Sequence, residues 1–224
     1  MRQSLSSLQH HAVLFDLDGT LIDSFPGIVS AYHHVLTQLD LGELNDSELA
    51  QFIGPPIREV LQQNFHLTGS RLEEGICIFR HHYGSQGLFR YTKYAGIDAM
   101  LHALHDSQYL LFIATSKLRS MALDLLDHAE WSDLFTYIGG ADASGDIYLK
   151  QDVIGLVLSN VPAKARALAM VGDRAADISG AHSLGLPGIG VTWGYGSVME
   201  LTGARPKEIV HSPQELLTSL VKLD

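Results

Sequence analysis

The sequence predicts an α/β protein with a doubly wound, Rossmann-like parallel sheet and an inserted all-helical cap domain. After residue 109, apolar strand-like runs alternate with helical segments up to the C-terminus. Fully apolar strands in such alternation are typical of a parallel sheet that helices cover on both faces. Between residues 25 and 91, by contrast, helical patterns follow one another without a convincing strand. We therefore predict an α/β core of residues 1–24 and 92–224 and a helical domain of residues 25–91.

The first predicted strand ends in two acidic residues. Its apolar run, residues 12–15, leads into Asp16-Leu17-Asp18-Gly19-Thr20. Ligands of open α/β sheets bind at the carboxyl ends of the strands, where these two carboxylates are expected to lie. Neighbouring carboxylates repel each other unless a cation or a shared proton relieves them. Taken alone, the segment also fits a strand followed by an ordinary Asp-Gly turn.

Helix-start signals divide the predicted helical domain. A proline opens the first helical pattern at residue 26, Asn45 precedes a second, two prolines at 55–56 precede a third, and Gly69-Ser70 precedes a fourth. Proline in the first turn and a polar residue just before it are typical helix starts. The fourth pattern is expected to end at residues 84–87, where two glycines lie.

The remaining elements alternate regularly. Apolar runs predict strands at 109–115, 135–139, 167–173, 188–191 and 208–210. Helical patterns are centred on residues 100–104, 121–126, 151–158, 175–184 and 213–220. Strand, helix and strand in this order predict crossover connections within one parallel sheet.

Further candidate residues follow three of these strands. Thr115 and Ser116 end the second strand and could donate to an anion, although such residues also cap helices. Lys150 follows a loop rich in Gly and Asp and would equally suit a solvated surface. Asp173 ends an apolar run, and Asp177 follows at the start of a helix, where an acid also favours the helix dipole.

Composition limits the function classes. The 224 residues are 46% hydrophobic and 18% charged, which suffices for a large core. The only cysteine is Cys77, so no internal disulfide can form, and we expect a cytoplasmic location. A net charge of -10 without a basic cluster argues against nucleic acid and anionic membranes, and no apolar run is long enough to span a membrane. An anionic substrate would need cations placed at its site.

In chain order the candidates read Asp-x-Asp-Gly-Thr, Thr-Ser, Lys and Gly-Asp-x-x-x-Asp. This set resembles the four motifs of the haloacid dehalogenase superfamily, including the helical cap inserted after the first motif. The segments at 52–56, 114–117, 171–174 and 194–197 are similar to the phosphoglycolate phosphatase and 5′-nucleotidase-like branch. Two departures are Leu118, where that branch usually has Pro, and Leu184-Gly185, where it usually has Asn-Gly.

The resemblance implies a phosphatase that acts through an aspartyl-phosphate. Asp16 would be the nucleophile, and Asp18 would protonate the leaving oxygen and then activate water. Thr115 and Lys150 would hold the phosphoryl oxygens, assisted by the backbone N–H groups of Leu17 and Ser116.

The resemblance also implies Mg²⁺ as the cofactor. Its ligands would be the carboxylates of Asp16 and Asp173 and the backbone carbonyl of Asp18, and Asp177 would act behind them by orienting a metal-bound water or Lys150. Oxygen ligands of this kind suit Mg²⁺.

Several alternatives stay open at this point. The substrate is expected to be a small phosphorylated metabolite, similar to phosphoglycolate or a nucleoside monophosphate. A phosphomutase or a pyrophosphatase of the same fold would carry the same motifs, whereas a non-catalytic binding module would be expected to lack a motif acid. Asp18 argues against dehalogenation, because a halide leaving group needs no proton.

Specificity and motion are assigned to the cap. Candidate specificity residues at its edge are Arg58, a tentative substrate contact, with Phe25, Tyr91 and Lys93. The candidate hinge residues are Pro26, Gly27 and Gly96, and closure of the cap over the first motif is expected. The sequence leaves open whether the protein is a monomer or a homodimer.

Overall fold

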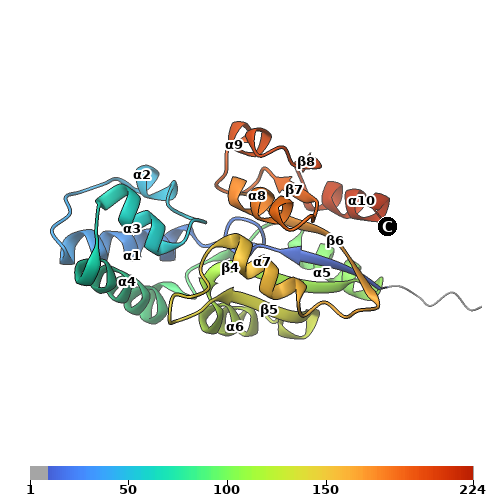
Figure 1. Ribbon diagram of the computed structural model, residues 1–224, viewed down its shortest axis with the longest axis horizontal. Helices are drawn as coiled ribbons and strands as arrows, with labels where there is room; N and C mark the ends of the chain where they lie inside the picture. The colour runs from blue at the N-terminus through green and yellow to red at the C-terminus, as the bar shows by residue number, and fades with distance from the viewer. Residues whose placement is uncertain (1–9, 224) are drawn as a thin grey trace, which may run out of the picture.

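The computed structural model describes residues 10–223; residues 1–9 and 224 of the predicted core lie outside this range. Six strands form one parallel sheet in the order β5-β4-β1-β6-β7-β8 (Figure 1). They are β1 (His10–Phe15), β4 (Leu110–Leu118), β5 (Phe135–Ala141), β6 (Ala165–Gly172), β7 (Gly188–Val191) and β8 (Glu208–Val210). Numbered among themselves, these strands have the order 3-2-1-4-5-6 of a Rossmann-type sheet. The predicted α/β class is confirmed.

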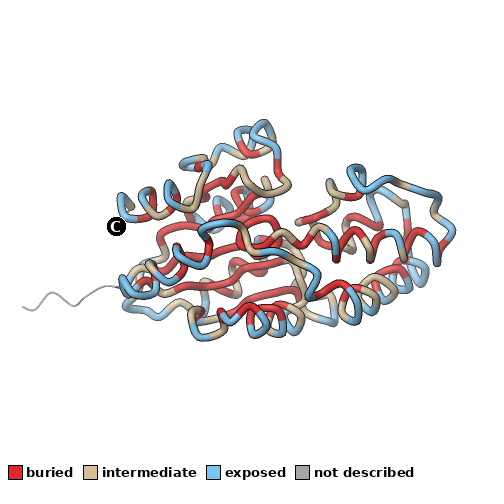
Figure 2. The backbone as a smooth tube through the Cα atoms, turned by 180° about the vertical axis from the view of Figure 1, so that it is seen from behind, coloured by how far each residue is buried: buried red, intermediate tan, exposed pale blue. Residues whose placement is uncertain are grey.

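Alternate side chains of each strand pack against helices on opposite faces. Val13 and Phe15 belong to the cluster that includes side chains of α5 (Ile97–Asp106), α6 (Arg119–His128) and α10 (Pro213–Leu223). Ala12 and Leu14 belong to the cluster on the other face, with α7 (Lys150–Leu158) and α8 (Ala175–Ser183). Figure 2 shows the strands as the buried interior of this layer. Two covered faces explain why the strands are apolar throughout.

The helical segment, residues 25–87, lies beyond the carboxyl ends of the strands (Figure 1). It contains α1 (Phe25–Gln38), α2 (Asp46–Ala50), α3 (Ile57–Phe65), α4 (Gly69–His82) and a π-helical turn η1 (Tyr83–Gly87). The side chain of Asn45 caps α2 by accepting from the backbone N–H groups of Ser47 and Glu48. Val35, Leu61 and Ile76 form part of a core between α1, α3 and α4.

A two-stranded antiparallel ribbon connects the helical segment to the sheet. Its strands are β2 (Ile22–Asp23) and β3 (Thr92–Lys93), which pair with each other immediately before and after the helices. The sequence did not predict this ribbon, because strands of two residues have no detectable periodicity.

Several element boundaries differ from the prediction. The strand β1 ends at Phe15 rather than at Asp18, so both acids lie in the following turn. The last helix of the segment ends as an α-helix at His82, and a π-helical turn, η1, follows and ends at Gly87, within the predicted range. The strand β4 continues to Leu118. A short 3-10 helix η2 (Ser132–Leu134) and α9 (Val198–Gly203) were not predicted.

Gly27 and Gly87 bring the first and last turns of the helical segment into backbone contact. A Cβ atom on Gly27 would lie 2.1 Å from the carbonyl oxygen of Gly87, and one on Gly87 would lie 2.8 Å from the carbonyl oxygen of Gly27. Only glycine allows this approach. Among the described residues, no helix has both the length and the apolar character needed to cross a membrane.

Candidate active site

Three aspartates meet where the strand order of the sheet reverses. Asp16 follows β1, Asp173 follows the neighbouring strand β6, and Asp177 lies in the first turn of α8. One carboxylate oxygen from each lies within 4.8 Å of the other two. Asp16 is 2% exposed, and Asp173 and Asp177 are fully buried. The predicted metal ligands with side-chain oxygens are therefore brought together at the expected edge of the sheet.

Lys150 is the cation that faces this cluster. It is the first residue of α7, and its Nζ lies 2.8 Å from Asp16 Oδ1 and 2.8 Å from Asp177 Oδ1. It also donates to the carbonyl oxygen of Ala114 at 3.2 Å. Burial lowers the pKa of Lys150, but Asp16 and Asp177 outweigh burial and raise that pKa above its usual value. Lys150 is therefore charged and held in a fixed position.

Asp173 is held by the loop after β7. The backbone N–H groups of Tyr195 and Gly196 donate to its Oδ2 at 2.8 and 3.4 Å, and Thr20 Oγ1 donates to its Oδ1 at 3.3 Å. A Cβ atom on Gly194 would lie 2.5 Å from the same carboxylate oxygen. The Gly-Tyr-Gly sequence at 194–196 thus brings the chain backbone against Asp173.

Burial also changes the proton affinity of the cluster. Burial, together with the charges of Asp177 and Asp16, raises the pKa of Asp173 to about 8. Burial raises the pKa of Asp16 to about 7 despite the opposing effect of Lys150. Three buried carboxylates and one lysine leave excess negative charge, which a proton or a bound cation can neutralise. The all-oxygen donor set fits a divalent cation such as Mg²⁺.

Asp177 differs from the other two acids in its partners. Its Oδ1 faces Lys150, and its Oδ2 accepts from the backbone N–H of Arg174 at 3.0 Å. Both oxygens are therefore engaged within the protein. This arrangement fits a residue that positions Lys150.

Asp18 lies beside a second buried lysine, Lys117. Lys117 Nζ is 3.0 Å from Asp18 Oδ1, and it also donates to the hydroxyl of Tyr83 at the start of η1. Burial lowers the pKa of Lys117, but the effects of Asp18 and Tyr83 raise it overall. Lys117 and Tyr83 are site residues that the sequence argument did not assign. The Thr-Ser-Lys run was the available signal for Lys117, whereas nothing marked Tyr83.

The predicted anion-binding residues lie at the end of β4. Thr115 is 1% exposed, and its Oγ1 accepts from the backbone N–H of Lys117 at 3.3 Å. Ser116 Oγ is buried without a hydrogen-bond partner among the described residues. Leu17 is fully buried between the two acids of the first motif.

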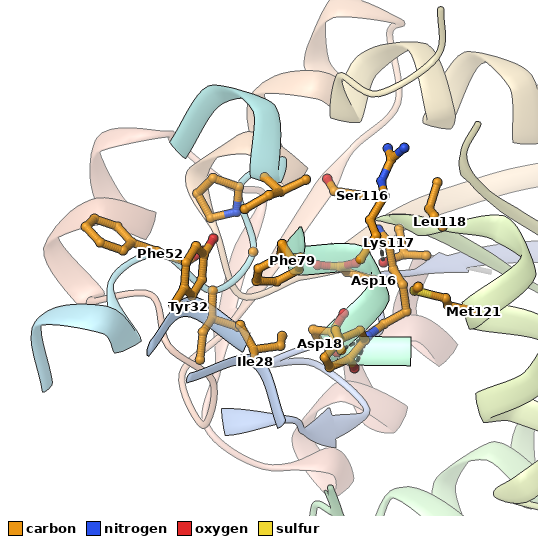
Figure 3. A pocket seen from close by; sticks show the side chains of 17 residues that line it. Asp16, Asp18, Ile28, Tyr32, Phe52, Phe79, Ser116, Lys117, Leu118 and Met121 are labelled. Carbon is orange, nitrogen blue, oxygen red and sulfur yellow. Dashed lines mark hydrogen bonds and ion pairs between the residues drawn. The ribbon is translucent and has the colours of Figure 1, made fainter. Parts of the chain in front are cut away.

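Some of these residues line a cavity between the sheet and the helical segment (Figure 3), whereas Lys150, Asp173 and Asp177 do not. The sheet side contributes Asp16, Asp18, Thr115, Ser116 and Lys117. The cavity has a volume of about 80 Å³. The helical segment covers the carboxylates, so a ligand bound there would contact both parts of the chain.

The four candidates at the edge of the helical segment do not line this cavity. The guanidinium of Arg58 pairs with both carboxylate oxygens of Glu73, at 2.6 and 3.0 Å. Tyr91 contacts His128, and Lys93 contacts Asp98. Phe25 begins α1, and its backbone N–H donates to Asp23. A substrate contact by Arg58 therefore stays a prediction.

Comparisons with known proteins show the family to which the chain belongs. Residues 13–191 match the family described as haloacid dehalogenase-like hydrolase. A 5′-nucleotidase of Pseudomonas aeruginosa is 32% identical over 201 residues, which cover 90% of this chain and 91% of that protein. A phosphoglycolate phosphatase of Aquifex aeolicus is 29% identical over 88% of this chain and 94% of its own. The crystal structure of a predicted phosphatase from Clostridium acetobutylicum superposes with a TM-score of 0.90 at 34% identity, covering 96% of this chain and all of that one.

Proposed function

Because the chain belongs to the haloacid dehalogenase-like hydrolase family, we propose that it is a Mg²⁺-dependent phosphatase of small phosphate monoesters. The observation that carries this proposal is the position of Asp16. Its carboxylate lies on the floor of the cavity, within 2.8 Å of Lys150 and beside Asp173. A phosphoryl group seated there would meet a nucleophile, a fixed cation and hydroxyl donors together.

Asp16 is proposed to attack phosphorus and form an aspartyl-phosphate, which water then hydrolyses. Asp18, two residues away in the same turn, would give a proton to the leaving oxygen and take one from the attacking water. Both carboxylates line the cavity, whereas Asp177 does not, which supports this division of roles.

Three side chains are proposed to hold the phosphoryl oxygens. Thr115 and Ser116 line the cavity, and the buried Ser116 hydroxyl is ready to donate to a ligand. Lys150 supplies a positive charge that its contacts hold in place. Fixed donors and charges of this kind supply much of the acceleration of phosphoryl transfer. The backbone N–H groups of Leu17 and Ser116 are proposed to assist.

Asp16, Asp173 and the backbone carbonyl of Asp18 are proposed to hold Mg²⁺. When bound, the ion would neutralise the excess carboxylate charge and the charge of the substrate phosphate. Asp177 would hold Lys150 in position without binding the ion, because one of its carboxylate oxygens contacts Lys150 and the other accepts from the backbone N–H of Arg174. The buried oxygen donors of the three aspartates support this assignment.

We further propose that residues 25–91 act as a mobile cap on a core of residues 1–24 and 92–224. The ribbon of β2 and β3 is the covalent connection between the two parts, so it is the place for a hinge. Phosphoglycolate and nucleoside monophosphates are the first substrates to consider. A single, exposed cysteine supports a cytoplasmic location.

The proposal is tested with Asp16→Asn. An amide is a poor nucleophile and a weaker metal ligand, so we expect hydrolysis of p-nitrophenyl phosphate to fall by roughly 10³-fold or more. The control is Asp124→Asn, an exposed aspartate on α6, which should keep wild-type turnover. Near-wild-type activity of Asp16→Asn would refute the covalent mechanism.

A substrate panel separates the remaining alternatives. It contains phosphoglycolate, nucleoside monophosphates, sugar phosphates and inorganic pyrophosphate, each with Mg²⁺. Release of phosphate from monoesters supports the phosphatase, preferential cleavage of pyrophosphate supports a pyrophosphatase, and isomerisation of a sugar phosphate supports a mutase.

A further inference from the structure

We propose that the natural substrate carries an aromatic ring on its leaving group, which the helical segment binds against its own aromatic side chains. This inference rests on the proposed phosphatase function and adds the substrate class. It places ring-bearing phosphate monoesters ahead of small, carboxylate-bearing ones such as phosphoglycolate.

The side of the cavity that the helical segment forms is mostly apolar. Its walls include Ile28, Tyr32, Phe52, Phe79 and Tyr83 from the helical segment and Met121 from α6 (Figure 3). Because Asp16 lies on the floor, a bound phosphate would direct its leaving group toward this wall. An apolar wall of this kind favours a leaving group that is itself apolar, because its surface is removed from water when it packs against the wall.

The aromatic rings form one continuous group. The ring centroids of Tyr32 and Phe79 are 4.9 Å apart, those of Tyr32 and Phe52 are 5.7 Å apart, and Phe79 and Tyr83 are stacked at 6.0 Å. Tyr32 and Tyr83 are 2% exposed, whereas Phe52 and Phe79 are only partly buried. The partly buried rings leave surface in the cavity for another ring, and offset or edge contacts between rings are favourable.

The two tyrosine hydroxyls of this wall are already engaged. The Tyr32 hydroxyl donates to the carbonyl oxygen of Phe52 at 3.2 Å, and the Tyr83 hydroxyl accepts from Lys117. A hydroxyl-rich leaving group would lose its water against these rings without gaining equivalent hydrogen bonds, which is unfavourable. The charged side chain of this wall is Arg80, which donates to the carbonyl oxygen of Ala143 at 3.4 Å. Recognition of a substrate carboxylate by Arg80 is the rival explanation.

The test compares monoesters of primary alcohols, so that the leaving groups have similar intrinsic reactivity. They are benzyl phosphate, adenosine 5′-monophosphate, cyclohexylmethyl phosphate, 2-phosphoglycolate and glycerol 3-phosphate. We expect kcat/KM for benzyl phosphate or for the nucleotide to exceed that for 2-phosphoglycolate at least tenfold. A preference for benzyl phosphate would identify a simple aryl group as the ring, and a preference for adenosine 5′-monophosphate would identify a nucleobase.

The variants Phe79→Ala and Phe79→Leu localise the effect. Both should lower kcat/KM for the ring substrate about tenfold, mainly through KM, and lower kcat/KM for 2-phosphoglycolate by a clearly smaller factor. Phe79→Leu keeps most of the apolar volume and guards against a folding defect in Phe79→Ala. Phe89→Ala is the matched control, because Phe89 is 51% exposed and stacks on His128 outside the cavity.

Three results would overturn the inference while the phosphatase function stands. The first is a preference for 2-phosphoglycolate or glycerol 3-phosphate over the ring substrates. The second is a kcat/KM for cyclohexylmethyl phosphate that equals or exceeds that for benzyl phosphate, and the third is an unchanged substrate ranking in both Phe79 variants. A selective loss of 2-phosphoglycolate hydrolysis in Arg80→Gln would support the rival explanation. Failure to hydrolyse any of the five esters would instead refute the proposed function.

Discussion

Individual residues of the site owe their properties to burial. An exposed aspartate is ionised at neutral pH, but Asp16 and Asp173 have pKa values of about 7 and 8 because water is excluded from them. Lys150 stays charged because the same acids surround it. The site therefore combines a fixed cation with buried carboxylates whose unfavourable charge is relieved when they bind either a proton or a metal ion.

This charge balance predicts how stability depends on pH. The two carboxyls have pKa values of about 7 and 8 in the folded chain and about 3.9 in an unfolded chain. Between about pH 4 and 8 the folded protein therefore binds more protons than the unfolded protein, and these groups lower the free energy of unfolding as pH rises. In EDTA, we expect Tm to fall from pH 5 to 8 more steeply in the wild type than in Asp173→Asn.

Mg²⁺ should reverse this effect by taking the place of the protons. We expect Mg²⁺ to raise the wild-type Tm more at pH 8 than at pH 6 and to have little effect on Asp173→Asn. Asp124→Asn serves as the control and should follow the wild type. An equal Mg²⁺ shift in Asp173→Asn would remove Asp173 from the metal site.

Lys117 provides a second prediction for single residues. Its removal leaves the Asp18 carboxylate buried without its partner, so Lys117→Met should lower the free energy of unfolding by about 3–5 kcal/mol, as broken buried pairs do. In the double variant Lys117→Met/Asp18→Asn much of this loss should be recovered, because the uncompensated charge is gone. Urea unfolding of the wild type, both single variants and the double variant measures the coupling. Additive effects would show that Lys117 does not stabilise the Asp18 carboxylate.

The sequence predicted the candidate residues that belong to motifs, and it did not predict those that join the candidate site through three-dimensional contact. Asp16, Asp173 and Asp177 lie together because strand ends of one sheet meet at one edge, which the strand pattern predicts. Tyr83 reaches Lys117 only because a turn of the helical segment lies over the sheet. The contact of Tyr195 with Asp173 through a backbone N–H leaves no signal in the residue type.

At the scale of elements, long periodic segments were predicted correctly and irregular ones were not. The parallel strands and the helices α1, α3, α4 and α10 have clear apolar patterns. The two residues of β2, the two of β3 and the π-helical turn η1 depend on contacts between distant parts of the chain. The glycines at 84 and 87 predicted a helix end, and η1 does end at Gly87. The sequence did not show that Gly87 also allows the backbone of η1 to approach α1.

This contact predicts the effect of Gly27→Ala. The new Cβ would overlap the carbonyl oxygen of Gly87 at 2.1 Å, so α1 and η1 must separate. We expect a loss of about 1–3 kcal/mol in the free energy of unfolding, as is usual for overpacking. Gly203→Ala in α9 is the control, because its Cβ would meet no atom within 4 Å, and it should be neutral or stabilising by up to about 1 kcal/mol. Equal stability of both variants in urea would contradict the close packing of these turns.

At the scale of the whole molecule, the helical segment lies beyond one end of the sheet (Figure 1). The cavity lies between these two parts, and one ribbon, formed by β2 and β3, joins them. Polar contacts also link the two parts, including Lys117 with Tyr83, Arg80 with Ala143 and Arg174 with the backbone of Gln51. Covering the cavity excludes water from the carboxylates, but a substrate needs a way in. A hinge at the ribbon satisfies both requirements.

The single cysteine allows this motion to be measured. Cys77 is exposed on α4 in the helical segment, and Asp124 is exposed on α6 in the sheet layer. Spin labels on Cys77 and on Asp124→Cys should give a broad distance distribution in the free protein and a narrower one with Mg²⁺ and beryllium fluoride, which mimics a phosphoryl group on Asp16. Labels on Asp124→Cys and Lys164→Cys in a Cys77→Ser background lie in the core alone and should show no change. An unaltered distribution for the first pair would mean that the helical segment is a rigid cover and that substrates enter by another route.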